Sequence, residues 1–167
     1  MSERNDNDSV DFAMLEKQLA ALLAGETDPL ANSANFVGLL FAAFSDVNWL
    51  GIYVLRGDEL VLGPFQGLPA CVRIPVGQGV CGTAAQKVAT MRVANVHAFA
   101  GHIACDPASK SELVVPLVVA DNLIGVLDID SASENRFSEK DQLGVELLCK
   151  RFTDILQSAD SDLPRFI

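Results

Sequence analysis

Apolar residues recur at helical spacing in two stretches near the start of the chain. The first stretch spans residues 9–25 and closes at Gly25, a typical helix stop, and the second begins at Pro29, a residue favoured in a first helical turn. The apolar positions are Phe12, Leu15, Leu19, Leu22 and Leu23 in the first stretch and Leu30, Val37, Leu40, Phe41 and Phe44 in the second. The pattern predicts two amphipathic helices, each with one face for a core.

A third helical stripe lies near the other end of the chain. Ser138, with Asp141 three residues later, resembles a capping box and predicts a final helix that ends at about Gln157. Its inner face would hold Val145, Leu148, Cys149, Phe152 and Leu156. Residues 1–8 and 158–167 are predicted to be flexible tails.

Between these helices the apolar pattern changes to that of strands and turns. Strands are predicted at residues 49–55, 59–62, 70–74, 91–96, 113–119 and 123–130, with a short helix at 79–87. Turn residues at Arg56-Gly57-Asp58 and at Asp121-Asn122 make hairpins of the first and the last strand pairs. Helices at both ends and hairpins in the middle predict a single α+β domain over residues 1–167, with a central, mostly antiparallel sheet and the N- and C-terminal helices packed on one face.

Composition and charge narrow the class of protein. Half of the 167 residues are hydrophobic, as expected for a globular domain, and the net charge of −10 argues against a nucleic-acid partner. No stretch reaches the roughly 18 apolar residues that span a bilayer, and the polar start of the chain resembles no signal peptide, so a cytoplasmic location is expected. In that compartment the four cysteines are expected to be structural thiols, metal ligands or redox catalysts rather than structural disulfides.

Three of the four cysteines lie in or beside turn-rich segments. Cys105 lies in a loop rich in Pro, Ser, Ala and Asp, where a thiol is accessible, and Cys71 and Cys81 lie near glycines and prolines. Because Cys81 falls in the first turn of the predicted helix, where amide groups favour a thiolate, it competes with Cys105 as the candidate nucleophile. Cys149, on the apolar face of the last helix, is predicted to be buried and inert.

Two motifs that could indicate a ligand site, a glycine run and a set of cysteines and histidines, are predicted not to form one. The run Gly77-Gln78-Gly79-Val80-Cys81-Gly82 has the form G-x-G-x-x-G, but the acid that a dinucleotide site needs about 20 residues later is missing, so a tight glycine turn is predicted. A metal site from Cys71, Cys81, His97, His102 and Cys105 lacks the compact residue pairs of zinc sites, and none is predicted.

The acidic residues of the second hairpin are more informative. Asp128 and Asp130 alternate along a strand and therefore share one face of the sheet, either as a solvated face or as a site that holds a cation or keeps one acid neutral. Glu112 joins them only in one register. A two-residue turn at Asp121-Asn122 pairs Leu113 with Asp130, whereas a three-residue loop pairs Glu112 with Asp130.

Trp49 and Tyr53 lie four residues apart on one predicted strand and share a face. They are either the wall of a site for a small apolar group or two half-buried strand aromatics.

Several short motifs together resemble the free methionine-(R)-sulfoxide reductases, enzymes built on the GAF fold. The motifs are Trp49-Leu50-Gly51-Ile52-Tyr53, Gly63-Pro64-Phe65-Gln66-Gly67, Cys71-Val72-Arg73-Ile74-Pro75, Gly79-Val80-Cys81-Gly82-Thr83-Ala84, His102-Ile103-Ala104-Cys105-Asp106, Ser111-Glu112-Leu113-Val114-Val115-Pro116 and Asp128-Ile129-Asp130-Ser131. The resemblance runs from about residue 48 to 151. It departs from the family at Leu68 and Gln78, where basic residues are frequent.

The resemblance implies a role for each candidate residue. Cys105 would be the nucleophile, Cys71 the usual resolving thiol and Cys81 a second resolving thiol. Glu112, Asp128 and Asp130 would line the substrate site together with Trp49 and Tyr53. A neutral carboxylic acid, with Glu112 and Asp130 as candidates, would protonate the sulfoxide oxygen.

The resemblance also implies the reaction and the partners. The enzyme would reduce free L-methionine (R)-S-oxide through a cysteine sulfenic acid and an intramolecular disulfide, which a thioredoxin-type protein would reduce. It would need no metal and no organic cofactor, and it would form a homodimer. The rival class is a non-catalytic GAF domain that senses a small ligand.

Overall fold

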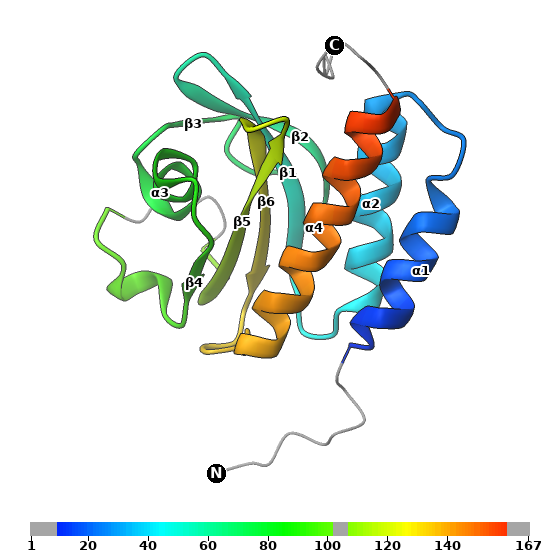
Figure 1. Ribbon diagram of the computed structural model, residues 1–167. Coiled ribbons are helices and arrows are strands. Elements are labelled where there is room, and N and C mark those ends of the chain that lie inside the picture. Colours follow the sequence, from blue (N-terminus) through cyan, green and yellow to red (C-terminus); the bar gives the residue numbers. More distant parts are fainter. Residues whose placement is uncertain (1–9, 102–106, 160–167) are drawn as a thin grey trace.

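A single antiparallel sheet organises the protein, whose computed structural model describes residues 10–101 and 107–159. Within these residues, six strands pair in the order β3-β2-β1-β6-β5-β4. Helices cover both faces of the sheet (Figure 1). The strands are β1 (Trp49–Arg56), β2 (Glu59–Gln66), β3 (Arg73–Pro75), β4 (Met91–Val93), β5 (Ser111–Val119) and β6 (Asn122–Ser131). The predicted α+β fold with an antiparallel sheet is confirmed.

Three capped helices form the layer on one face: α1 (Phe12–Leu22), α2 (Pro29–Ala43) and α4 (Glu139–Ala159). Each begins where a side chain accepts from an otherwise unpaired backbone N–H. Asp11 accepts from Met14 at 3.0 Å, and Asp28 accepts from Ala31 at 2.8 Å. Ser138 and Asp141 form the predicted reciprocal box, in which the backbone N–H of Asp141 donates to Ser138 Oγ at 3.1 Å. These N- and C-terminal helices pack together on one face of the sheet, as predicted (Figure 1).

The larger core lies between these helices and the sheet. All five positions predicted for the inner face of α4 are buried, including Cys149. Two predicted core positions are wrong, because Leu22 and Leu30 are 45% and 40% exposed. Phe36, absent from the predicted stripe, is fully buried and stacks on Phe152 with ring centroids 4.3 Å apart. The helix layer and one face of the sheet thus share the larger of the two cores.

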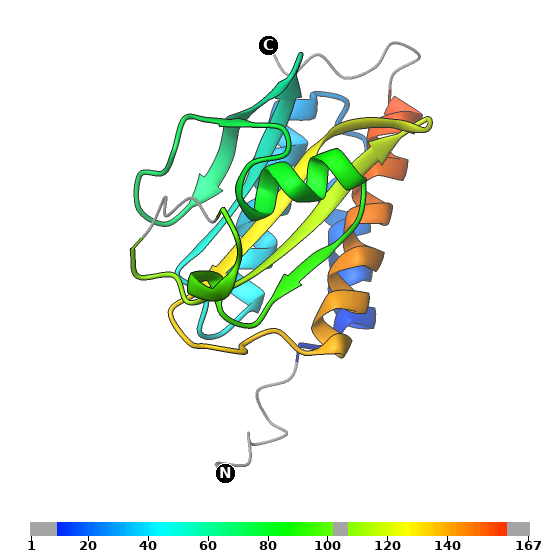
Figure 2. The ribbon, with the colours of Figure 1, turned by 90° about the vertical axis from the view of Figure 1, so that its left-hand side faces the viewer.

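A smaller core lies on the opposite face, beneath the short helix α3 (Gly79–Lys87), whose bounds match the prediction. Figure 2 shows α3 lying across the sheet on the side away from α1, α2 and α4. The glycine run before it forms the predicted tight turn, because Gly77 and Gly79 have φ of 89° and 63° and the Gly77 N–H donates to the carbonyl of Gly82 at 2.8 Å. The buried members of this core are Trp49, Tyr53, Leu60, Ile74, Val80, Cys81, Ala84, Ala85, Val114 and Val126.

Four predicted segments differ clearly from the structure. The strand expected at residues 59–62 continues to Gln66 as β2. The strand expected at residues 70–74 is confined to β3, and the one expected at 91–96 ends at Val93, before the 3-10 helix η2 (Val96–Ala98). α4 continues to Ala159, two residues into the predicted tail, while residues 1–8 and 160–167 lie outside the described part of the chain.

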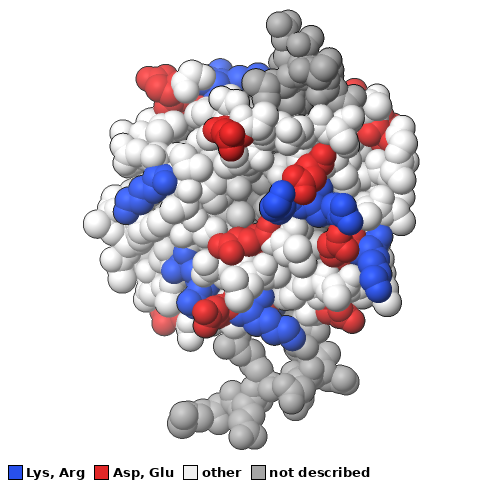
Figure 3. Space-filling model, in the orientation of Figure 1, with Lys and Arg blue, Asp and Glu red and all other residues white. Residues whose placement is uncertain are grey.

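The outer surface carries both signs of charge. On the face shown in Figure 3, Lys and Arg side chains alternate with Asp and Glu, and no continuous basic patch forms there. Lys150 pairs with Asp154 at 2.9 Å along α4. Among the helices of the described residues, none combines the length and the apolar character needed to cross a membrane.

Candidate active site

An aromatic stack lines the sheet face beneath α3. Trp49 and Tyr53 are 2% and 1% exposed, so they are fully buried rather than half-buried, and their rings stack with centroids 5.8 Å apart. Phe65 of β2 stacks on the other side of Trp49 at 5.5 Å. Gly51, between the two aromatics of β1, leaves the room that the indole occupies, since a Cβ there would lie 2.5 Å from the Trp49 ring.

The register of the β5–β6 hairpin brings the predicted acids to the same face. Glu112 lies directly opposite Asp130, and Val114 lies opposite Asp128. On the other side of β6, Asp130 pairs with Trp49 and Asp128 with Gly51. Residues that face each other across antiparallel strands point to the same side of the sheet. The acid cluster of Glu112, Asp128 and Asp130 therefore adjoins the aromatic stack, as the second of the two predicted registers required.

A bulge, and not the predicted three-residue loop, produces this register. The turn consists of Ala120 and Asp121, both with positive φ of 47° and 64°. The pairing then shifts between Leu117 and Val118, where Ile124 of β6 has no opposite residue. Two-residue turns with positive φ at both positions match the twist of a hairpin, and a bulge adds one residue to one strand.

Glu112 and Asp128 form a tight buried group with Cys81 of α3. Both acids are 6% exposed and Cys81 is 4% exposed. The Cys81 thiol donates to Glu112 Oε1 at 3.7 Å. The sulfur and one carboxylate oxygen of each acid, the atoms that could bind a metal ion, lie within 4.8 Å of one another. Among the described residues this is the set near enough to share a metal ion, and it differs from the Cys and His set weighed from the sequence. Asp128 Oδ1 is buried and has no hydrogen-bond partner among the described residues.

Burial raises the pKa values of these acids to different extents. The pKa of Glu112 is raised well above its usual range, first by burial and then by the charges of Asp128 and Asp130. Burial also raises the pKa of Asp128, to about 6, against hydrogen bonds from Cys81, Glu112 and the Ile129 backbone that lower it. Asp130 is only partly buried. Burial therefore favours the neutral form of both acids, and of Glu112 more strongly than of Asp128.

The expectation of a thiolate at Cys81 is wrong. Cys81 does lie in the first turn of α3, but burial raises the pKa of its thiol, and the charge of Asp128 raises it further. The desolvation and the charge of Asp128 outweigh the helix dipole, whose effect is small and falls off within the first turn. Cys81 is therefore a protonated hydrogen-bond donor in this structure.

The other cysteines occupy different surroundings. Cys71 is half-buried, lies between β2 and β3 and is disulfide-bonded, whereas Cys81 and Cys149 are free. Cys105 and His102 lie outside the described residues. His97 lies in η2, where its backbone N–H donates to Asn95 Oδ1 at 2.9 Å.

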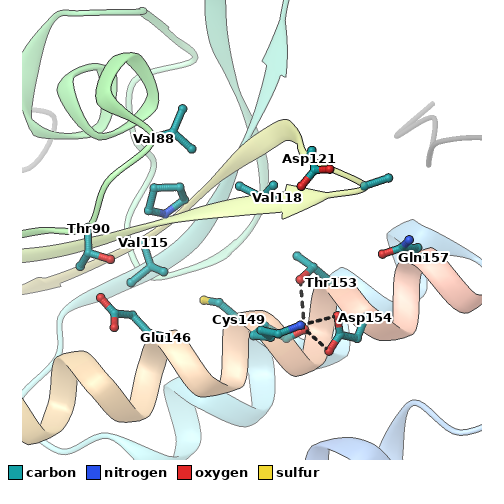
Figure 4. Close-up of a pocket in the computed structure, with 13 residues that line it drawn as sticks. Val88, Thr90, Val115, Val118, Asp121, Glu146, Cys149, Thr153, Asp154 and Gln157 are labelled. Carbon is teal, nitrogen blue, oxygen red and sulfur yellow. Dashed lines mark hydrogen bonds and ion pairs between the residues drawn. The ribbon is translucent and has the colours of Figure 1, made fainter.

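Cys149 belongs to a second region, remote from the acid cluster in the fold. It is 2% exposed, and burial raises the pKa of its thiol, as expected for an inert core cysteine. It lines a cavity of about 570 Å³ between α4 and the β5–β6 hairpin (Figure 4). None of the acid cluster lines this cavity.

Sequence reasoning assigned no role to Phe65, which completes the aromatic stack. The pairing of the first hairpin is the sequence signal that could have identified it. Phe65 lies directly opposite Gly51, the residue midway between Trp49 and Tyr53 on β1. A glycine flanked by two aromatics on one strand leaves space that a large residue of the next strand can fill.

Comparisons with known proteins agree with this arrangement. The family model described as "GAF domain" matches residues 28–155. The free methionine-R-sulfoxide reductase of Escherichia coli is 52% identical over 149 residues, which cover 89% of this chain and 90% of the relative.

Two solved structures of similar proteins contain a substrate. The Staphylococcus aureus fRMsr in complex with substrate has a TM-score of 0.85 and 46% identity, covering 89% of this chain and 97% of that one. The free methionine-R-sulfoxide reductase of Neisseria meningitidis in complex with its substrate has a TM-score of 0.87 and 40% identity, covering 95% of each chain. With its GAF fold and this similarity, the chain belongs to the GAF domain family and, within it, to the free methionine-R-sulfoxide reductases.

Proposed function

We propose that this protein reduces free methionine-(R)-sulfoxide to methionine with its own cysteines as the electron donors. The observation that carries the proposal is the buried acid pair Glu112 and Asp128, whose pKa values burial raises, beside the stacked rings of Trp49 and Tyr53. A sulfoxide needs a proton donor, and a free amino acid needs a partner for its ammonium group. The similarity to reductases solved with substrate supports the same assignment.

Each side chain has a distinct role in this proposal. Glu112, kept protonated by burial, donates the proton to the sulfoxide oxygen. Asp128 and Asp130 accept from the substrate ammonium, and the unpaired Oδ1 of Asp128 supports this role, since buried polar atoms are normally hydrogen-bonded. Trp49 and Tyr53 form the apolar wall against which the methyl and methylene groups pack.

The reaction balances with two thiols per sulfoxide. The sulfur of Cys105 attacks the substrate sulfur, the oxygen moves to Cys105 as a sulfenic acid, and methionine leaves with its sulfur reduced by two electrons. A second thiol then attacks the Cys105 sulfur, an S–S bond forms, the S–O bond breaks, and the oxygen leaves as water.

Cys71 is the resolving thiol in this proposal. Its half-buried position and its disulfide support this role, with Cys105 as the proposed partner. Cys81 is a weaker candidate, because a buried thiol with a raised pKa forms little thiolate. Glu112 and Asp130 were both candidates for the proton donor, and the deeper burial of Glu112 favours it.

The remaining expectations complete the proposal. A thioredoxin-type dithiol protein in the cytoplasm would reduce the disulfide, without a metal or an organic cofactor, and the active form would be a homodimer.

Counting thiols during one turnover tests the proposal against a ligand-sensing GAF domain. The reduced protein is mixed with methionine-(R)-sulfoxide without a reductant, and free thiols and methionine are measured together. The expected result is the loss of two thiols for each methionine released. A sensor would bind the sulfoxide with no loss of thiols and no methionine, and that outcome would overturn the proposed function.

A further inference from the structure

The two aromatic side chains of β1 carry hydrogen-bond donors that point to the segment containing Cys71. The Trp49 indole N–H donates to the carbonyl of Leu68 at 3.1 Å, and the Tyr53 hydroxyl donates to the carbonyl of Cys71 itself at 3.0 Å. The acceptors are backbone atoms, so the contacts fix the path of the chain and not the identity of its side chains.

This segment, residues 67–72, lies between β2 and β3 and forms neither strand nor helix. Ala70 and Cys71 pack against the smaller core, whereas Leu68 and Val72 are 68% and 63% exposed. Besides the two aromatic donors, the backbone N–H of Leu62 donates to the carbonyl of Val72 at 3.0 Å. Hydrogen bonds to its backbone therefore add to the packing and the disulfide that position Cys71.

The donors themselves are held rigidly. Trp49 is stacked between Tyr53 and Phe65, with interplanar angles of 28° and 16°. Gly67 passes directly over the indole, since a Cβ there would lie 2.7 Å from both the Trp49 ring and the carbonyl oxygen of Asn48. The buried rings of Trp49 and Tyr53, with the partly buried Phe65, are thus a fixed support for the segment next to them.

We propose that Tyr53 and Trp49 are positioning residues for the Cys71 thiol, in addition to forming the wall of the substrate site. A disulfide requires Cα atoms within about 7 Å and a restricted torsion, so a loosely held segment forms the bond slowly and holds it weakly. The hydroxyl of Tyr53 and the indole of Trp49 keep Cys71 in the position of the oxidised state. The catalytic consequence rests on the proposed function, whereas the effect on the disulfide does not.

The surroundings of Tyr53 keep its hydroxyl a donor. Burial raises the pKa of Tyr53, and the nearby charge of Asp128 raises it further. A protonated phenol can donate to a carbonyl, whereas a phenolate cannot. The contact with Cys71 therefore persists across the pH range in which the thiols react.

Tyr53→Phe separates the positioning role from the wall role, because it removes the hydroxyl and keeps the ring. In dithiothreitol buffers, we expect the equilibrium between disulfide and dithiol to shift toward the dithiol by roughly 2- to 10-fold, as for the loss of one neutral hydrogen bond. In a single turnover of the same variant, disulfide formation should slow by a similar 2- to 10-fold relative to the methionine release that precedes it.

Thr153→Val is the matched control. Thr153 Oγ1 donates to the carbonyl of Lys150 at 3.0 Å on α4, so the variant loses a hydroxyl-to-carbonyl bond on the opposite side of the sheet. Its disulfide equilibrium should equal that of the wild type. Trp49→Phe, which removes the indole N–H, provides a second variant and should shift the equilibrium in the same direction as Tyr53→Phe.

Two outcomes would overturn the inference. One is an unchanged disulfide equilibrium in both aromatic variants, and the other is an equal shift in Thr153→Val, which would indicate general loosening of the fold. The equilibrium measurement needs no sulfoxide. A wild-type protein that forms the disulfide and releases no methionine would therefore contradict the proposed function and leave this test intact.

Discussion

Two carboxyl groups of similar chemistry behave differently because they share a buried space. Once Asp128 is ionised, with a pKa near 6, its charge and the burial of Glu112 make a second negative charge costly, so Glu112 keeps its proton. The Cys81 thiol donates to Glu112 and lowers that carboxyl's pKa slightly, without reversing the effect. A neutral acid next to an ionised one is the arrangement required to donate a proton and hold a cation in the same site.

Glu112→Gln tests the role of that proton. The amide preserves the shape and can donate a hydrogen bond, but it cannot transfer a proton to the sulfoxide oxygen. Since general acids contribute about 10²- to 10⁴-fold, the rate of methionine release should fall by that range while substrate binding changes little. A rate within about threefold of the wild type, measured by single-turnover quench, would exclude Glu112 as the acid.

We expect Glu112→Gln also to change how the free energy of unfolding depends on pH. Raised carboxyl pKa values mean that the folded protein binds more protons than the unfolded chain, whose carboxyls titrate near 4. The free energy of unfolding should therefore decrease as the pH rises from about 4 through 6 and beyond. Glu112→Gln lacks one of these groups, so urea titrations should show its stability relative to wild type increasing with pH. A constant difference from pH 4 to 8 would contradict the assigned protonation.

Cys71→Ser tests the resolving thiol. The variant should release about one methionine per chain and then stop at the sulfenic acid, because no thiol remains in position to form the disulfide. With a thioredoxin-type protein as the reductant, Cys149→Ala is the control and should sustain turnover, since Cys149 is buried in the helix layer. Sustained turnover by Cys71→Ser would assign the resolving role to Cys81 instead.

At the level of elements, the β5–β6 hairpin determines whether the site exists. Without the unpaired Ile124, the turn at Ala120-Asp121 would place Glu112 opposite Ile129, and the acids would face opposite sides of the sheet. The bulge therefore has a functional consequence several residues away from its own position.

Gly125, next to the bulge, provides a test of this close pairing. A methyl group there would overlap the carbonyl oxygen of Tyr53 and lie 3.2 Å from Val54 Cα. Gly125→Ala should lower the free energy of unfolding by about 1–3 kcal/mol, as for other overpacked sites. Gly38 lies inside α2, and a Cβ added there would have no neighbouring heavy atom within 4 Å. Gly38→Ala should therefore leave the free energy of unfolding unchanged or raise it by about 0.5–1 kcal/mol. Equal effects in urea unfolding would contradict the packing argument.

Elements with a local signal were predictable, and contacts between elements were not. The cap at Ser138 and the glycine turn before α3 depend on nearby residues, so the sequence indicates both. The pairing of Glu112 with Asp130 depends on one unpaired residue, and the pattern allowed two registers. Cys81 was expected to be a thiolate because its position in a helix is visible in the sequence, whereas its burial against Asp128 and Glu112 is visible only in the fold.

Across the whole molecule, the sheet lies between the larger core and the candidate active site. One face packs against α1, α2 and α4 in the larger core, and the other face, beneath α3, holds the aromatic stack and the acid cluster (Figures 1 and 2). Strands β1, β5 and β6 contribute alternate residues to both faces, so each site residue on these strands has at least one sequence neighbour in the larger core. Rigid support of this kind keeps a site of several side chains in register.

The substrate preference of the whole enzyme tests the central claim most directly. Free methionine-(R)-sulfoxide, free methionine-(S)-sulfoxide and the N-acetylated (R)-sulfoxide are each supplied with dithiothreitol, and formation of the reduced product, methionine or N-acetylmethionine, is measured. We expect turnover of the free R form, discrimination against the S form, and a loss of roughly 10- to 150-fold on acetylation, since charged hydrogen bonds contribute about 1.5–3 kcal/mol. Equal rates on the acetylated compound, or a preference for the S form, would contradict the account.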